Sequence, residues 1–175
     1  MLSCQPRFIP FKFFLELLMN TICAAMHQSK YTRAPHPVLT IDGIPLGNWI
    51  KGVIYDDSGE DDTEGLVPAQ GWLIDEEHAS YSWQLLTPAE EECTTIVPLL
   101  ICPDDLDLNC TVVVVEQVTS EDKLIWERFG RAVAVINGVI SSVAWSTNHQ
   151  CAKFSRQQFE EACAEFKRLI DHEWA

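Results

Sequence analysis

Two apolar runs separated by an acidic turn, with a third run behind them, dominate the middle of the chain. Within residues 96–129, IVPLLIC and CTVVVVEQV flank the segment PDDLDLN, and KLIWERF follows. Val and Ile are enriched in strands, whereas Asp, Asn and Pro favour turns. The stretch therefore predicts a β-meander that supplies most of the core, with strands at 96–102, 110–118 and 123–129.

Two Asx-Gly pairs predict further hairpins. Asp42-Gly43 lies between the apolar segments VLTI and IPL, and Asn137-Gly138 comes just before an apolar run at 139–145. Such a pair between apolar runs is a strong signal for a two-residue turn. In the meander itself, a turn over residues 119–122 would place Val115 opposite Trp126. We therefore expect about four to six antiparallel strands.

The last element predicted is an amphipathic helix. Ser155 and Gln158 have the spacing of a capping box, and Phe154 and Phe159 flank it at the staple positions. Apolar residues then recur at helical spacing at Phe159, Cys163, Phe166 and Ile170. The predicted fold class is α+β, an antiparallel β-meander with a C-terminal amphipathic helix packed on one face.

The length of 175 residues and 47% hydrophobic content suit one compact domain. We place this single α+β domain at residues 34–175 and interpret residues 1–33 as an N-terminal extension. A short helix is expected within 46–54, while strands and short helices both stay open for 65–74 and 81–86.

The N-terminal segment Phe8 to Met26 is rich in Phe and Leu, but Lys12, Glu16 and Asn20 interrupt it. It is therefore a poor secretory signal and too short to span a bilayer. Met1 and Met26 both stay open as the working start. The seven cysteines are odd in number and lack the dense spacing of a disulfide scaffold, which favours a reducing, cytoplasmic location.

Negative charge is the strongest compositional feature. The chain has 12 basic and 26 acidic side chains, a formal net charge of −14, and residues 1–33 contribute no net negative charge. This charge opposes binding to nucleic acid and to anionic membranes, both of which depend on Lys and Arg. A basic protein is the natural electrostatic partner, and solubility alone is the alternative explanation.

Two acidic segments are the candidate partner-binding surface. Neither matches the calcium-loop pattern, and ordinary turns are the alternative interpretation. The candidate residues are Asp56, Asp57, Glu60, Asp61, Asp62, Glu64, Asp104, Asp105 and Asp107.

Two cysteines bracket the second acidic segment. If 96–102 and 110–118 pair, Cys102 and Cys110 face each other at the base of a seven-residue loop, close enough for a disulfide or a shared metal. A zinc site would need two more ligands, for which His149 and Cys151 are the candidates. The spacing matches no metal motif, and buried cysteines are commonly small hydrophobes, so no metal or other cofactor is predicted.

The chain carries no recognised motif for nucleophilic, phosphate-binding or metalloprotease chemistry. A hydrolytic or metal-dependent enzyme is thus the second hypothesis, behind a binding protein. A third is a structural or regulatory subunit that shares its helix stripe with a partner.

The segment LLICPDDLDLNCTVVVVE followed by LIWERFGR resembles small acidic bacterial proteins of unassigned function. Some proteins of this kind, single α+β domains with strong negative charge, are immunity proteins that neutralise toxins. The resemblance implies a cytoplasmic binding protein whose partner is a basic toxin. It implies no catalytic residues, and the oligomeric state stays open.

Overall fold

The strands form two antiparallel sheets in the computed structural model, which describes residues 19–55 and 59–173. The three-stranded sheet has the order β1-β2-β3, and the six-stranded sheet has the order β4-β5-β6-β7-β8 with β9 also paired to β7. The smaller sheet consists of β1 (Ile22–His27), β2 (His36–Ile41) and β3 (Ile44–Pro45). The larger consists of β4 (Val67–Pro68), β5 (Cys93–Ile101), β6 (Val112–Thr119), β7 (Lys123–Ile136), β8 (Val139–Trp145) and β9 (Ala152–Ser155).

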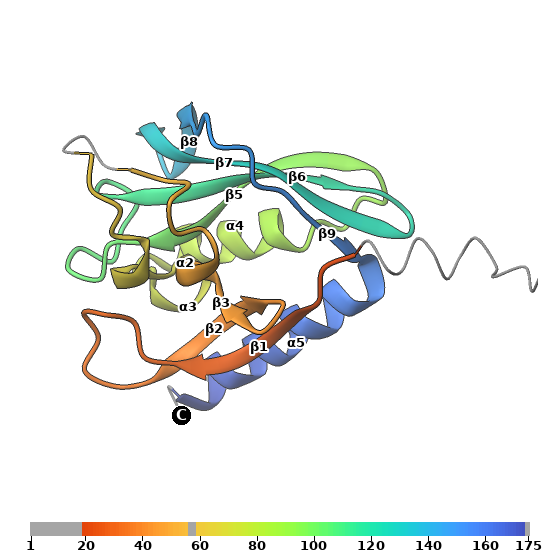
Figure 1. Cartoon of the computed structure of the whole chain (residues 1–175), viewed down its shortest axis with the longest axis horizontal. Coiled ribbons are helices and arrows are strands. Elements are labelled where there is room, and N and C mark those ends of the chain that lie inside the picture. The colour runs from red at the N-terminus through yellow and green to blue at the C-terminus, as the bar shows by residue number, and fades with distance from the viewer. Residues whose placement is uncertain (1–18, 56–58, 174–175) are drawn as a thin grey trace, which may run out of the picture.

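Helices lie between and below these sheets (Figure 1). Helices α3 and α4 contact β5 on one face of the larger sheet. Helix α5 runs along β1 and β2 and also reaches β7 and β9, so it joins the two sheets. The helices are α2 (Leu46–Trp49), the 3₁₀ turn η1 (Thr63–Gly65), α3 (Ala69–Trp72), α4 (Glu76–Leu86) and α5 (Arg156–Glu173). The α+β prediction, with a C-terminal helix packed on the sheet, is confirmed.

Both Asx-Gly hairpins are present. Asp42 and Gly43 have φ of 52° and 79°, and Asn137 and Gly138 have φ of 50° and 77°, the left-handed values that a two-residue type I′ turn requires. Pro45 ends β3 after two residues, as expected for an edge position.

The register predicted for the β6–β7 hairpin is wrong. Trp126 pairs with Gln117 and Val115 pairs with Phe129. Ser120 N donates to Lys123 O at 2.9 Å, so the turn lies at residues 120–123, one residue later than expected, and the partner of Trp126 shifts by two residues. A bulge beside Gln117 then shifts the remaining pairs by one more residue.

Helix α5 begins as its capping box predicts. Gln158 N donates to Ser155 Oγ at 3.2 Å, and the rings of Phe154 and Phe159 lie 5.7 Å apart. Phe166, from the same stripe, is buried and lies 5.7 Å from the ring of Trp83 in α4. The stripe therefore packs on Trp83 of α4 and on the larger sheet, and β1 and β2 also pack closely along the helix.

Trp126 lies at the centre of the main core. It is fully buried, with the rings of Phe154, Phe159 and Phe129 packed edge-on at 5.3, 5.9 and 6.1 Å. Its indole nitrogen donates to Gln117 Oε1 at 2.9 Å. Such edge-on ring contacts are favourable beyond the apolar area they bury.

The segments left open by the sequence are now assigned. Residues 65–74 contain β4 and α3, and α4 spans Glu76–Leu86. Strand β1 lies inside the segment that was interpreted as an N-terminal extension, and its Ile22 is buried. From residue 22 onward that segment is thus part of the fold, while residues 1–18 lie outside the described residues. Of the helices that the structure describes, none has the length and apolar composition required to cross a bilayer.

His36 gives the fold a pH dependence. The residue is 1% exposed, its Nε2 lies 3.2 Å from Ser29 Oγ, and its ring packs edge-on against Trp72 at 5.3 Å. Burial lowers the pKa of His36 below its ordinary value of 6.5, and the Ala34 backbone opposes this in part. Just below pH 6.5 unfolding therefore takes up a proton, and stability present above that pH is lost as the pH falls.

We expect the urea midpoint of the protein to fall between about pH 7 and pH 5.5, and that of a His36→Gln variant to fall less. The carboxyl groups whose pKa values are lowered, such as those of Asp42 and Asp107, change the stability only at more acidic pH. They therefore do not contribute to the change between about pH 7 and pH 5.5. An equal fall of the urea midpoint with pH in the two proteins would rule out the assignment of this pH dependence to His36.

Candidate functional site

The two acidic segments, distant in sequence, meet around one cavity. The cavity has a volume of about 150 Å³ and lies between residues 60–66 and the β5–β6 loop. Its walls include Tyr31, Glu60, Asp62, Cys102, Asp104 and Arg131. We call this region the acidic cavity. Sequence reasoning selected both of its acidic segments but missed Tyr31, which no motif marks.

Two carboxylates of the first segment, those of Asp61 and Glu64, are engaged in hydrogen bonds within the fold. Asp61 accepts hydrogen bonds from Thr63 N and Thr63 Oγ1 at 3.1 and 2.8 Å and one from Gly52 N. Glu64 accepts from Asn48 Nδ2 and from Lys51 Nζ at 2.8 and 2.9 Å. These two predicted binding residues are thus structural. Asp56 and Asp57 lie outside the described residues.

Asp62 lies at the cavity and also ties it to the β1–β2 connection. Its carboxylate accepts from the Tyr31 hydroxyl at 2.9 Å and pairs with Lys30 Nζ at 3.1 Å. The Tyr31 hydroxyl and the Asp62 carboxylate raise the pKa of Lys30. Because this ion pair is exposed, its contribution to stability is small.

In the second segment, Asp107 is a turn residue. It accepts from Asn109 N at 2.8 Å and from Asn109 Nδ2 at 3.1 Å, which lowers the pKa of its carboxyl. Asp104 and Asp105 are exposed. Within the described residues, the carboxylates of the two segments that are classed as exposed are those of Glu60, Asp104 and Asp105.

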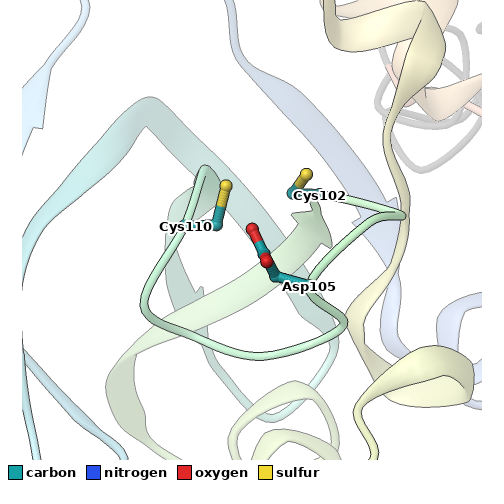
Figure 2. A group of neighbouring side chains, drawn as sticks. All are labelled: Cys102, Asp105 and Cys110. Carbon is teal, nitrogen blue, oxygen red and sulfur yellow. The ribbon is translucent and has the colours of Figure 1, made fainter.

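A second cluster adjoins the cavity through Cys102. Figure 2 shows the side chains of Cys102, Asp105 and Cys110 grouped at the β5–β6 loop, with the carboxylate between the two thiols. Their Sγ and carboxylate atoms all lie within 4.8 Å of one another, and neither thiol is in a disulfide. We call these three residues the thiol cluster.

The thiol cluster corrects the zinc ligand set considered from sequence. Among the residues that the structure describes, the cluster includes neither His149 nor Cys151, which are exposed on the connection from β8 to β9. Asp105 takes their place as the third group. The facing of Cys102 and Cys110 was predicted, whereas Asp105 was considered only as part of an acidic surface.

The loop folds locally into the shape that gathers these groups. Leu106 N donates to Cys102 O at 3.2 Å, a tight turn that brings Asp105 back toward Cys102. Cys102 N donates to Thr111 O at 3.1 Å and closes the base of the loop. Leu108 is buried and anchors the far side in a second hydrophobic cluster with Val112 and Val114.

Cys110 is a poor nucleophile. Partial burial, together with Asp105 and Cys102, raises the pKa of Cys110 to about 11. A nucleophilic cysteine needs its pKa lowered toward neutrality instead. The thiol cluster offers two sulfur ligands and one oxygen ligand to a cation.

Comparison of the chain with protein-family models, curated proteins and solved structures found no match.

Proposed function

We propose that this chain is a cytoplasmic binding protein that docks the face around its acidic cavity onto a basic surface of another protein. One observation carries the proposal: two acidic segments some 40 residues apart in sequence converge on a single cavity. A net charge of −14 adds long-range attraction for a positively charged partner.

Two exposed carboxylates of the cavity wall, those of Glu60 and Asp104, would make the contacts. Tyr31, which is 54% exposed, offers an aromatic side chain at the rim, a residue type enriched where binding energy concentrates. A lysine or arginine of the partner would enter the cavity between these groups. Complementary charge mainly accelerates encounter and selects the partner.

Within this class, the resemblance of residues 99–116 and 124–131 to immunity-type proteins makes a basic toxin the partner of first choice. The alternative of a subunit that shares its helix stripe has less support. Phe159, Cys163 and Phe166 are 1–2% exposed because the chain itself covers them, so the stripe is not available to a partner.

The test is affinity capture from source-cell lysate at low and high salt, followed by a binding titration with the protein retained. A Glu60→Gln/Asp104→Asn variant is expected to bind that partner about tenfold or more weakly, which corresponds to about 1.4 kcal/mol. The matched control, Glu90→Gln/Glu92→Gln, changes the net charge equally at exposed positions in the α4–β5 connection and is expected to bind within about twofold.

Equal weakening by both variants would show that net charge alone, and not this face, drives the binding. If the affinity capture retains no basic protein at low salt, the proposal is wrong. Both variants keep Asp61 and Asp62, so the hydrogen bonds of those two carboxylates are intact.

A further inference from the structure

We propose that Cys102, Asp105 and Cys110 bind one zinc ion. Zinc in proteins takes thiolate and carboxylate ligands in tetrahedral geometry. The thiol cluster supplies two of the former and one of the latter from a single loop (Figure 2). The inference does not rest on the proposed function, because it follows from the loop's own geometry.

The spacing of the ligand atoms is close to what zinc requires. Zn–S bonds of about 2.3 Å at a tetrahedral angle place two sulfurs about 3.8 Å apart. In the structure all three groups lie within 4.8 Å of one another, so contraction by up to about 1 Å would complete the site. Cys102 is half-buried and the other two residues are exposed, so their side chains have room for this movement.

The backbone beneath the ligands is held while their side chains can move. Cys102 is fixed at both of its backbone groups, by the hydrogen bonds with Thr111 O and Leu106 N. Leu106 O accepts from Ile74 N at 3.2 Å, which ties the loop to the α3–α4 connection. A preorganised loop lowers the conformational entropy that ion binding would otherwise cost.

The two soft sulfur ligands determine which metal the site would prefer. Sulfur ligands favour zinc over magnesium and calcium, which require oxygen ligands. Binding displaces a proton from each thiol to solvent and forms two Zn–S bonds and one Zn–O bond, with no electron transferred. Three protein ligands leave the fourth position to water, as in zinc sites that stay open to an outside group.

The site has a direct consequence for the acidic cavity. Cys102 belongs to both the thiol cluster and the cavity wall, and Asp104 lies between two ligands in sequence. A bound zinc ion would therefore hold the wall of the cavity in one shape.

The experiment is titration of the reduced, metal-free full-length protein with Co²⁺, then with Zn²⁺. We expect sulfur-to-cobalt charge-transfer absorption with tetrahedral d–d bands that saturates at one equivalent and is lost when Zn²⁺ displaces the cobalt. Cys102→Ser and Cys110→Ser are expected to weaken Zn²⁺ binding more than about a hundredfold, and Asp105→Asn about tenfold, relative to wild type.

The matched controls are Cys23→Ser and Cys151→Ser, which remove exposed thiols elsewhere and are expected to leave Zn²⁺ affinity unchanged. Metal-free unfolding of every variant should match that of the metal-free wild type, which separates ligand loss from misfolding. Three results would each overturn the proposal. They are the absence of a charge-transfer band in the wild type, a loss of Zn²⁺ affinity in a control variant equal to that in the ligand variants, and a Cys102–Cys110 disulfide in protein purified without oxidant. The Glu60→Gln/Asp104→Asn variant keeps all three zinc ligands, so its Zn²⁺ affinity should equal that of the wild type even if it no longer binds the partner protein.

Discussion

Trp126→Ala is expected to lower the free energy of unfolding by about 3–5 kcal/mol. The substitution removes a fully buried indole that three aromatic rings surround, and it leaves Gln117 Oε1 without its donor. A cavity this central cannot close without moving β7, β9 and α5 together. Urea unfolding followed by far-ultraviolet circular dichroism measures the loss without depending on tryptophan fluorescence.

The matched control is Trp145→Ala on β8. Trp145 is half-buried and lies under the Arg128 guanidinium at 4.2 Å, so its loss is expected to cost only about 1 kcal/mol. A smaller loss for Trp126→Ala than for Trp145→Ala would contradict the placement of the core.

Gln117→Leu is expected to cost about 2–4 kcal/mol, although it replaces a polar side chain by an apolar one of similar size. Gln117 is fully buried, and its Nε2 donates to Leu86 O and Leu85 O at 3.0 and 3.2 Å. The substitution orphans the Trp126 indole N–H and weakens the end of α4. Each buried group left without a partner costs about 1–3 kcal/mol.

A double-mutant cycle isolates this hydrogen bond. Trp126→Phe removes the indole N–H, so Gln117→Leu made in that background should cost about 1 kcal/mol less than it does in the wild type. Strict additivity of the two unfolding free energies would mean that the bond between Gln117 and Trp126 contributes nothing.

Features governed by local chemistry were predictable from the sequence. Asp42-Gly43 and Asn137-Gly138 specify their turns through the positive φ that Asn, Asp and Gly tolerate. Ser155 specifies the start of α5 because its hydroxyl satisfies a backbone N–H that no helical carbonyl reaches. None of these signals depends on the rest of the molecule.

Features governed by long-range packing were not predictable. Strand β1 contains Ala24, Ala25 and Met26, which have little strand preference, and only its pairing with β2 makes it a strand. The β6–β7 register depends on a bulge that no local pattern marks. It depends also on the position of the turn at residues 120–123, which brings Gln117 opposite Trp126, where Gln117 is buried and hydrogen-bonded.

The candidate site divides in the same way. The facing of Cys102 and Cys110 followed from a hairpin, which is local. The position of Asp105 beside them depends on the turn from Cys102 to Leu106. Glu60 and Asp104 line one cavity only because the tertiary structure brings residues 60–66 beside the β5–β6 loop. Composition identified the acidic residues, but only the tertiary structure separates those that bind the backbone from those that face solvent.

The packing of β1 against α5 determines when the β1–β2 hairpin can reach its native packing during translation. Just before these two elements, Asn20 and Lys153 of β9, 133 residues apart, exchange hydrogen bonds. At ribosomal speeds the β1–β2 hairpin would wait roughly ten seconds before residues 156–173 emerge to cover it. Throughout that interval its inner face would be open to chaperones, and the nascent chain would reach its native state only after translation had passed α5.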